Sequence, residues 1–542
     1  MKIALAQLNF RIADFEGNSR KIINAIQEAS QQNCQLIVFA ELSVCGYPPL
    51  DFLETPDFIQ KCNEAIHKIA AACKNITAIL GAPSVNPVKE GKNLFNSAYV
   101  LNQGTIQEII HKSLLPTYDV FDEYRYFEPA TQNQIVQIGS KKIALTICED
   151  LWNLEDDPLY VSSPMDKLIL QQPDFMINIA ASPFAFGHPK YRSEVLKKNV
   201  DQYKIPLLYV NQIGSQTELI FDGGSMVLNR KGDKVVSAKS FKEDLLMFDL
   251  NDLDAKPSTG DKNAEKYDEI YSALLLGIRD YFSKMNFKNA ILGLSGGIDS
   301  ALVLTLASHA LGNNNVKAIL MPSPYSSKGS IDDSIALCNA LAVDFQIIPI
   351  SDSFTQIKTT LENSFEGKKS DVAEENIQAR LRGLMLMAIS NKHGYILLNT
   401  SNKSELAVGY GTLYGDMCGG LSVIGDLYKT EVYELSRYIN QIKMTIPEAI
   451  LNKAPSAELR PDQKDSDSLP DYSLLDNILY RYIEQKKSTQ TIIEEGYDEA
   501  TVRKMISLVN INEYKRKQFA PILRVSRKAF GMGRRFPIVA NY

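Results

Sequence analysis

Short apolar runs alternate with longer, polar-faced stretches along the whole chain of 542 residues. The apolar runs have the length of buried strands. The stretches between them have helical spacing, as the apolar residues Ile22, Ile23 and Ile26 show within 18–32. Such alternation is typical of βαβ units, in which helices cover the faces of a mostly parallel sheet. The sequence therefore predicts an α/β protein built in layers.

A polar stretch without hydrophobic periodicity divides the chain into two halves. Residues 253–268 contain Pro, Gly and several charged side chains, which is typical of a linker. Because single hydrophobic cores stop growing at about 250–300 residues, a chain of 542 residues needs more than one domain. We therefore expect one domain at 1–252 and a second at 269–542.

The apolar runs give the expected strands, and a helix expected at 269–285 leads into the second set. We expect strands at 2–8, 36–40, 77–81, 97–101, 142–147, 175–179, 207–210, 225–228 and 246–250 in the first half, and at 290–294, 316–321, 345–350 and 395–400 in the second.

Charge, the N-terminal sequence and cysteine usage exclude several classes of protein. A formal net charge of -6 argues against a protein that binds nucleic acid mainly through phosphate contacts. The start, MKIALAQLNF, lacks the features of a signal peptide, and no apolar run approaches the about 20 residues that cross a bilayer. Seven cysteines without CxxC pairs or zinc spacing indicate free thiols. We expect a cytoplasmic protein that binds neither nucleic acid nor membranes.

Three reactive residues directly follow apolar runs in the first half: Glu41 after LIVFA, Lys112 after QEIIH and Cys148 after KIALTI. The carboxyl ends of strands in α/β folds meet at a common crevice, so these residues can meet there. A carboxylate can take the proton of a thiol, and a lysine ammonium can stabilise a thiolate or an oxyanion. Each residue alone is more often structural, but the three together predict nucleophilic chemistry on a carbonyl.

A cysteine–histidine hydrolase is the alternative for this site. The chain has five histidines, and His111 directly precedes Lys112. Adjacent residues in an extended segment face opposite ways, so both cannot readily point into one pocket. We expect Lys112 to point into the site and His111 to lie against the core or solvent.

The contexts of the three residues carry a family resemblance. The segments AELSVCGYPP, HKSLLPTYDVFDEYRYFEP and ICEDLW resemble the nitrilase or carbon–nitrogen hydrolase family, over roughly residues 1–250. The resemblance implies a four-layer αββα sandwich with Glu41 as general base, Lys112 as stabiliser of the oxyanion and Cys148 as nucleophile. It also implies a second, structural glutamate at Glu123 and a thioester intermediate that forms as ammonia leaves.

The second half opens with a glycine-rich turn in AILGLSGGIDSALVLTLASHAL, where a strand is followed by a helix that begins near Ser300. Gly296 and Gly297 let the backbone approach an anion, and free N–H groups at a helix start favour phosphate. Ser295 and Ser300 can donate hydrogen bonds to phosphate, and Asp299 can help to hold Mg²⁺. Two glycines alone would predict an ordinary turn, and the string is not a Walker A motif.

Two other segments have weaker signals. GYGTLYG at 409–415 has the wrong spacing for a dinucleotide fingerprint and does not follow a strand, so we expect a loop. The region 454–470 is rich in Pro, Ser and Asp, and it is either a mobile lid or a surface loop.

The full string SGGIDS resembles the pyrophosphate loop of the ATP pyrophosphatase family, whose members cleave ATP to AMP and pyrophosphate by adenylating a substrate. Segments 375–390, 399–435, 453–472 and 515–538 resemble the glutamine-dependent NAD synthetase family, so that the resemblance covers nearly the whole chain. It implies a Rossmann-like parallel sheet in the second domain, with Mg²⁺ and ATP. The first domain then frees ammonia from glutamine, and the second amidates adenylated nicotinic acid adenine dinucleotide to NAD.

This resemblance also implies roles for single residues. The expected ATP-binding residues are Ser295, Gly296, Gly297, Ile298, Asp299, Ser300, Thr400 and Lys429. The expected dinucleotide-binding residues are Asn376, Arg380, Glu405 and Lys515, and the expected metal ligands are Asp299 and Glu405. The expected glutamine-binding residues are Tyr118, Ser182 and His188, where the family often has Lys or Arg at the position of His188; Lys190 and Arg192 are the alternatives for the glutamine carboxylate.

Two alternatives for the whole chain stay open at this point. One is an amidotransferase of the same design that acts on another adenylated acceptor, such as a purine nucleotide. The other is a non-catalytic scaffold, which the intact set of reactive residues disfavours. Since free ammonia would be lost to solvent, two sites in one chain also predict an internal route for ammonia, completed by neighbouring subunits in a homo-oligomer.

Overall fold

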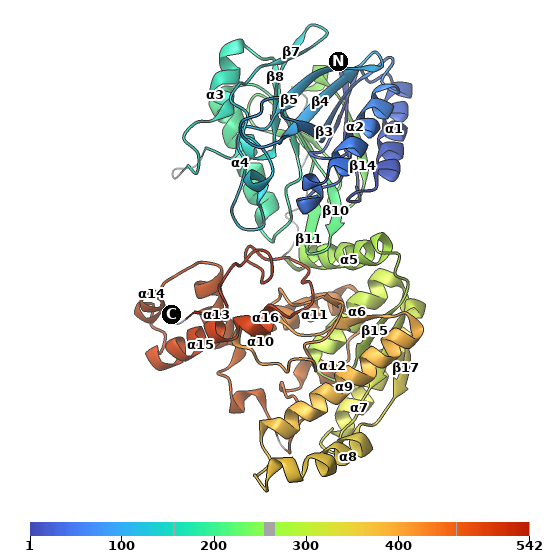
Figure 1. Ribbon diagram of the computed structural model, residues 1–542, viewed down its shortest axis with the longest axis vertical. Helices are drawn as coiled ribbons and strands as arrows, with labels where there is room; N and C mark the ends of the chain where they lie inside the picture. Colours follow the sequence, from blue (N-terminus) through green and yellow to red (C-terminus); the bar gives the residue numbers. More distant parts are fainter. Residues whose placement is uncertain (155–157, 254–265, 462, 541–542) are drawn as a thin grey trace. The chain divides into compact units, whose positions relative to one another are not determined.

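The computed structural model describes residues 1–542 except 155–157, 254–265, 462 and 541–542, and the chain forms two compact units, Met1–Ala264 and Glu265–Tyr542 (Figure 1). The linker expected at 253–268 falls mostly on 254–265, outside the described residues. Its last three residues instead form the first turn of helix α5 (Lys266–Lys284), where the carboxylates of Asp268 and Glu269 favour a helix start.

The first unit is built around two mixed sheets of six strands each. In spatial order, the first sheet contains β14 (Asp244–Asp249), β1 (Lys2–Gln7), β2 (Leu36–Phe39), β3 (Thr77–Val85), β4 (Leu94–Asn102) and β5 (Thr105–His111). The second sheet contains β13 (Lys234–Ser237), β12 (Met226–Leu228), β9 (Leu207–Asn211), β8 (Phe175–Ala180), β7 (Lys141–Ile147) and β6 (Val136–Ile138). The hairpin of β10 (Ile213–Gln216) and β11 (Leu219–Asp222) lies beside them.

The two sheets pack face to face, and helices cover their outer faces (Figure 1). One buried cluster joins Leu5 and Val38 of the first sheet to Leu145 and Ile177 of the second. The outer face of the first sheet is covered by α1 (Phe15–Gln31) and α2 (Pro56–Ala70), and that of the second by α3 (Pro164–Leu168) and α4 (His188–Tyr203). The αββα sandwich that the family resemblance implied is confirmed.

Both sheets place parallel strands at their centres. β1, β2 and β3 run parallel in the first sheet, as do β7, β8 and β9 in the second. Every strand predicted in this half overlaps an observed one. The short strands β6, β10, β11 and β13 were not predicted, because runs of three or four residues carry little periodicity. β5 was also missing from the predicted strands, although the run QEIIH before Lys112 lies within it.

The second unit contains a parallel sheet of five strands with helices on both faces. Its spatial order is β17 (Asp344–Ile347), β16 (Val316–Leu320), β15 (Ala290–Gly293), β18 (Ile396–Asn399) and β19 (Leu421–Ser422). From β15 the chain continues to β16 and β17 on one side of the sheet and then crosses to β18 on the other side. The strand order therefore reverses between β15 and β18, which is the switch point of a Rossmann-like sheet. Ligands of such sheets bind beyond the strand ends at this point.

The helices of this unit form the layers around the sheet and a separate helical cluster. Those of the sheet layers are α5, α6 (Ile298–Leu311), α7 (Lys328–Leu341), α8 (Ser351–Leu361), α9 (Val372–His393), α11 (Lys429–Ile442) and α12 (Glu448–Asn452). The cluster contains α10 (Lys403–Val408), α13 (Tyr472–Ile483), α14 (Thr489–Glu494), α15 (Glu499–Ile511) and α16 (Glu513–Arg516). The predicted strand at 345–350 ends earlier, at Ile347, because α8 begins at Ser351.

In the described part of the chain, none of the helices combines the length and the apolar character needed to cross a membrane.

Candidate active sites

Glu41, Lys112 and Cys148 all follow the carboxyl ends of strands, and they come from both sheets of the first unit. Glu41 follows β2 and Lys112 follows β5 in the first sheet, whereas Cys148 follows β7 in the second. The Lys112 ammonium lies 2.7 Å from Glu41 Oε1 and 2.8 Å from Glu123 Oε2, and its side chain has no exposed surface. The sandwich therefore gathers residues that are far apart in the sequence.

Further polar groups fix the two carboxylates. Asn96 Nδ2 donates to Glu41 Oε1 at 2.7 Å and to Glu123 Oε2 at 3.2 Å. The backbone N–H of Ala181, at the end of β8, donates to Glu41 Oε2 at 3.0 Å, and the Tyr47 hydroxyl donates to Glu123 Oε1 at 2.9 Å. Buried charges are tolerated only when they are paired and hydrogen-bonded in this way.

Cys148 sits in a strained turn beside this cluster. Its backbone has a φ of 41°, which is uncommon for a residue with a side chain, and its exposed fraction is 5%. Burial raises the pKa of the Cys148 thiol well above its usual range, as does the charge of Glu41, whereas Lys112 lowers it. The thiol is therefore protonated at rest, and it needs a base to become a nucleophile.

His111 points away from this cluster, as predicted. Its Nδ1 lies 2.8 Å from Ser97 Oγ, and its ring stacks on Phe95 with the ring centres 4.2 Å apart. A cysteine–histidine pair involving His111 is thus excluded by the direction of the side chain, while Lys112 points into the site.

Two of the expected glutamine-binding residues lie next to residues of this site, since Tyr118 contacts Glu149 and Ser182 follows Ala181, whose N–H donates to Glu41. The Tyr118 hydroxyl donates to Glu149, the residue after Cys148, at 2.9 Å, and Tyr160 donates to the same carboxylate at 3.1 Å. Burial raises the pKa of Glu149 to about 7. Ser182, which follows β8, is buried, and its N–H donates to Asn211 Oδ1 at 2.8 Å.

The three candidates for the glutamine carboxylate have different environments. His188 is half-buried and stacks on Trp152, with the ring centres 5.4 Å apart and the planes 15° from parallel. Lys190 is exposed. Arg192 is buried, and its Nη1 donates to Asp222 Oδ1 at 3.0 Å, so a carboxylate of the protein already neutralises its charge.

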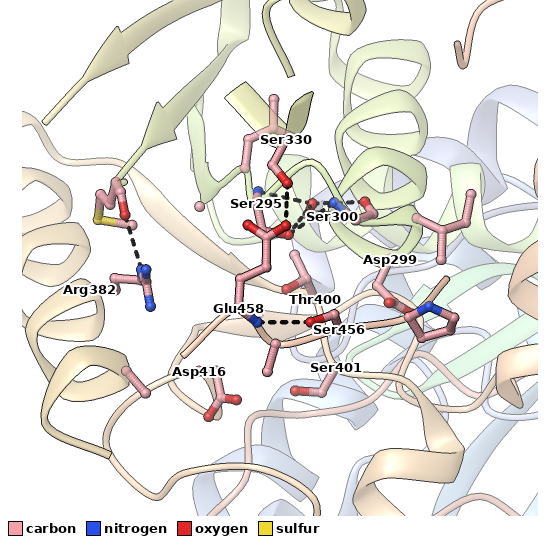
Figure 2. Close-up of a pocket in the computed structure, with 18 of the residues that line it drawn as sticks. Ser295, Asp299, Ser300, Ser330, Arg382, Thr400, Ser401, Asp416, Ser456 and Glu458 are labelled. Carbon is pink, nitrogen blue, oxygen red and sulfur yellow. Dashed lines mark hydrogen bonds between the residues drawn. The ribbon is translucent and has the colours of Figure 1, made fainter. Parts of the chain in front are cut away.

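A pocket of about 280 Å³ lies in the second unit at the carboxyl ends of β15 and β18 (Figure 2). Most of the expected ATP-binding and metal-binding residues line it, namely Ser295, Gly297, Ile298, Asp299, Ser300, Thr400, Glu405 and Lys429. The pocket is therefore at the switch point of the sheet, where ligands of this fold bind.

The glycine-rich turn joins strand β15 to helix α6, as the sequence predicted. Ser295 Oγ accepts the N–H of Gly297 at 3.2 Å and lies 3.1 Å from Ser300 Oγ. Gly296 has a φ of 78°, and a Cβ at this position would lie 2.4 Å from the carbonyl oxygen of Ser330. Glycine is therefore required at 296 by both the backbone angle and the contact. The helix begins at Ile298, two residues before the predicted start.

Asp299, Glu405 and Lys429 come together at one side of the pocket. The Lys429 ammonium contacts Asp299 Oδ2 and lies 3.4 Å from Glu405 Oε1. Asn402 joins the same two residues, because its Nδ2 donates to Asp299 Oδ1 at 2.9 Å and its Oδ1 accepts the N–H of Glu405 at 3.0 Å. Burial raises the pKa of Glu405 to about 8.

The arrangement of the two carboxylates fits Mg²⁺. This ion commonly binds to one or two carboxylates and completes its shell with water and substrate phosphates. No group of three or more possible ligands among His, Cys, Asp and Glu occurs in the described residues, so a site made of protein side chains alone does not fit.

The other expected dinucleotide-binding residues lie outside the lining of this pocket. Asn376 Oδ1 accepts the hydroxyl of Thr412 at 2.7 Å, and Arg380 Nε donates to the carbonyl of Leu413 at 3.2 Å. Lys515 Nζ donates to the carbonyls of Gly409 and Gly411 at 2.7 and 2.8 Å. All three therefore contact the 409–415 segment, which is a loop as predicted.

Sequence reasoning missed several residues of the pocket. Met321 and Leu386 form part of its apolar wall, and Arg382 Nε donates to the carbonyl of Met321 at 3.1 Å. Lys453 and Glu458 belong to the segment 453–459, which also lines the pocket, and Glu458 directs its carboxylate toward Ser330 (Figure 2). The Pro- and Ser-rich composition of this region and the family resemblance of 453–472 pointed to the segment, but neither singled out these two residues.

Comparisons with known proteins agree with this two-part geometry. Residues 2–255 match the family described as carbon–nitrogen hydrolase, and residues 270–519 match the family described as NAD synthase. The chain is 45% identical to the glutamine-dependent NAD(+) synthetase of Synechocystis sp. over 100% of its length and 99% of that protein. It is 42% identical to the enzyme of the same name from Acinetobacter baylyi over 100% of its length and 98% of that protein.

A solved structure agrees at the level of the fold. The glutamine-dependent NAD+ synthetase from Acinetobacter baumannii in complex with adenosine diphosphate has a TM-score of 0.79 and 38% identity, and the match covers 99% of this chain and 98% of that one. Both halves, in the same order and over the full length, are therefore shared with these enzymes. The chain belongs to the glutamine-dependent NAD(+) synthetase family.

Proposed function

We propose that the chain is a glutamine-hydrolysing NAD synthetase. The first unit hydrolyses glutamine to glutamate and ammonia. The second unit uses ATP to adenylate the carboxylate of nicotinic acid adenine dinucleotide, and ammonia then displaces AMP to give NAD. The observation that carries this proposal is that one chain holds both the buried Glu41–Lys112–Cys148 cluster and an SGGIDS turn that opens into a pocket.

The residues of the first site support a thioester mechanism. Glu41 takes the proton of the Cys148 thiol, and the sulfur attacks the side-chain carbonyl of glutamine. Lys112 stabilises the oxyanion of the tetrahedral intermediate, because it is a fixed cation in a site that excludes water. The proton then passes to the leaving nitrogen, ammonia departs, and water hydrolyses the thioester with Glu41 as base.

Binding of glutamine is assigned to residues around Cys148. The Tyr118 hydroxyl donates to Glu149, which follows Cys148, and Ser182 follows Ala181, whose N–H donates to Glu41. His188 stacks on Trp152, four residues beyond Cys148. We assign the glutamine carboxylate to the neighbourhood of His188, since Asp222 already neutralises Arg192 and Lys190 is exposed.

In the second unit, Ser295–Ser300 and Thr400 bind the phosphates of ATP through backbone N–H groups and hydroxyls. Asp299 and Glu405 would hold Mg²⁺, which supplies positive charge to the phosphates when it is bound. Lys429 contacts both carboxylates and is assigned to the ATP phosphates as a buried cation at the same place. Asn376, Arg380 and Lys515 are assigned to the dinucleotide around the 409–415 loop.

Two further properties follow as proposals. All seven cysteines are free thiols, which supports a cytoplasmic location. A homo-oligomer is proposed on the ground that ammonia needs a protected route from one reaction to the other.

The acceptor is tested by measuring AMP formation. The protein is incubated with ATP, glutamine and one carboxylate acceptor at a time, including nicotinic acid adenine dinucleotide and aspartate, and in a separate reaction with a purine nucleotide. The proposal predicts AMP and NAD in equal amounts with nicotinic acid adenine dinucleotide and no AMP with the others. AMP formation with the purine nucleotide alone would favour an amidotransferase for that acceptor.

A further inference from the structure

Asp150, two residues after the nucleophile, has contacts that the mechanism above does not use. Its exposed fraction is 3%, and its side chain accepts three backbone hydrogen bonds. Oδ2 accepts the N–H of Ile147 at 3.0 Å, and Oδ1 accepts the N–H groups of Ser113 and Leu114 at 3.0 and 2.9 Å. A buried carboxylate is costly unless such donors compensate it, so the three bonds hold it firmly in place.

The three donors lie directly beside two catalytic residues. Ile147 precedes Cys148, whereas Ser113 and Leu114 follow Lys112. β7 carries Cys148 in the second sheet, and β5 carries Lys112 in the first, so Asp150 joins the two sheets at the ends where the reactive side chains meet.

Tyr118, from the loop after Lys112, also reaches the cysteine turn through the side chain of Glu149, whereas two other contacts of this turn stay within its own half of the sandwich. Asn178 Nδ2 donates to the carbonyl of Cys148 at 3.3 Å, but it comes from β8, a neighbour of β7 in the same sheet. Asn199 Nδ2 donates to the carbonyl of Leu151 at 2.8 Å and comes from α4, on the outer face of that sheet. These two contacts fix the turn within its own half of the sandwich.

We propose that Asp150 is a positioning residue for glutamine hydrolysis. It clamps the loop after Lys112 to the turn of Cys148 and so sets the distance between the Lys112 ammonium and the Cys148 sulfur. The clamp also holds Cys148 at its positive φ, because the bond to Ile147 closes the turn around the nucleophile. Asp150 does not touch the reacting atoms, and it acts through Cys148 and Lys112. This inference rests on the proposed glutaminase activity of the first unit.

Asp150→Asn tests the clamp with little change in size. An amide has one acceptor oxygen, so its NH₂ group must face either the N–H of Ile147 or the N–H groups of Ser113 and Leu114. One of the two attachments is therefore lost. Asp174→Asn is the matched control, because Asp174 Oδ2 accepts the N–H of Lys142 at 2.8 Å at the opposite end of the same strand.

Steady-state kinetics separate positioning from general damage. A displacement of reacting groups by about 1 Å can cost on the order of 100-fold in rate, so we expect Asp150→Asn to lower kcat for glutamine by about 10- to 100-fold. KM for glutamine and NAD synthesis from added ammonia should stay close to the wild-type values. Asp174→Asn should leave all three quantities unchanged. A kcat close to the wild-type value, or an equal loss with added ammonia, would overturn the proposal.

The pH dependence of Cys148 alkylation is a property that loss of stability alone does not change. The rate of reaction of Cys148 with iodoacetamide is measured against pH, with Cys148→Ala as the blank for the other cysteines. Since Lys112 lowers the pKa of the thiol, a looser clamp moves the alkylation midpoint to higher pH in Asp150→Asn but not in Asp174→Asn. An unchanged midpoint contradicts the clamp.

If Asp150→Asn does not fold, hydrogen exchange in the wild-type protein decides. Ser113 and Leu114 lie beyond the end of β5, and the clamp predicts that their N–H groups exchange as slowly as those of the strand. Exchange as fast as in exposed loops would overturn the proposal. Failure of the glutaminase assay in the wild type would instead reject the proposed function.

Discussion

At the scale of single residues, the first site keeps three charges out of water in a small volume. Lys112 is fully buried between Glu41 and Glu123. Such a group of charges contributes little net stability as a whole, but removal of one member leaves the others without compensation. Trp152, the single tryptophan of the chain, lies in this unit and reports its unfolding by fluorescence.

Lys112→Met is therefore expected to destabilise the first unit by about 3–5 kcal/mol, because two buried carboxylates lose their cation. Lys141→Met is the control, since Lys141 pairs with Asp174 at 3.1 Å with 40% of its side chain exposed. Surface pairs contribute at most about 1 kcal/mol. Urea unfolding followed by Trp152 fluorescence measures the free energy of unfolding of both variants. Equal losses of stability in Lys112→Met and Lys141→Met would contradict the burial of a charged lysine.

Glu149→Gln is expected to change how stability depends on pH. Burial raises the pKa of Glu149 from 4.5 to about 7, so the folded state keeps a proton that the unfolded state has lost between these values. Stability from this group is complete below pH 4.5 and is lost as the pH rises through 7, by up to about 3 kcal/mol. In Glu149→Gln the side chain at this position does not titrate, so this loss of stability does not occur.

Relative to the wild type, Glu149→Gln should therefore gain stability between about pH 5 and pH 8. Urea unfolding of both proteins, followed by Trp152 fluorescence at about pH 5 and at about pH 8, checks this gain in stability. A constant difference between variant and wild type would mean that Glu149 titrates at its ordinary pKa.

The sequence revealed the reactive residues of this site and, through the family resemblance, Glu123, but not the other residues that support them. Glu41, Lys112 and Cys148 each follow an apolar run, and a residue type with known chemistry at a strand end is readable from one sequence. Asn96 and Asp150 give no such signal, because a polar residue inside a strand or a turn usually makes local bonds. Their partners are distant in the sequence, so only the packed sandwich shows what they do.

At the scale of elements, close backbone contacts at two glycines hold each site in place. A Cβ at Gly81 of β3 would lie 2.2 Å from the backbone nitrogen of Leu42, next to Glu41. A Cβ at Gly296 would lie 2.4 Å from the carbonyl oxygen of Ser330 in α7. Backbone atoms cannot give way as a flexible side chain does, so each substitution must displace a catalytic segment.

Gly81→Ala and Gly296→Ala are expected to have opposite effects. The first should lower glutamine hydrolysis on the order of 100-fold through displacement of Glu41 and spare NAD synthesis from added ammonia. The second should spare glutamine hydrolysis and stop AMP formation. Assays of glutamate release and of AMP release, each with the other unit's substrates omitted, measure the two effects. Loss of both activities in either variant would contradict this local account.

Elements were predictable where a clear apolar run marks them. The central strands of all the larger sheets were found because they are buried on both faces. The 409–415 loop was recognised, but not that Asn376, Arg380 and Lys515 gather around it. That arrangement depends on the packing of α9 and α16 against one loop, which no local pattern encodes.

At the scale of the whole molecule, two units with separate cores carry two different kinds of chemistry. The pattern of apolar runs predicted two α/β domains, whereas the order of strands within each sheet was not readable. The four-layer sandwich and the Rossmann-like sheet were implied by the family resemblance. In physical terms, apolar periodicity identifies a strand but does not determine its neighbour, which depends on long-range packing.

The central claim is that one unit frees nitrogen and the other activates its acceptor, and a pair of variants tests it directly. NAD formation is measured with glutamine and with added ammonia in Cys148→Ala and in Asp299→Ala, together with glutamate release. Cys148→Ala should make NAD from ammonia but not from glutamine. Asp299→Ala should release glutamate but form no NAD or AMP from either donor. Loss of ammonia-dependent synthesis in Cys148→Ala, or AMP formation by Asp299→Ala, would contradict the account.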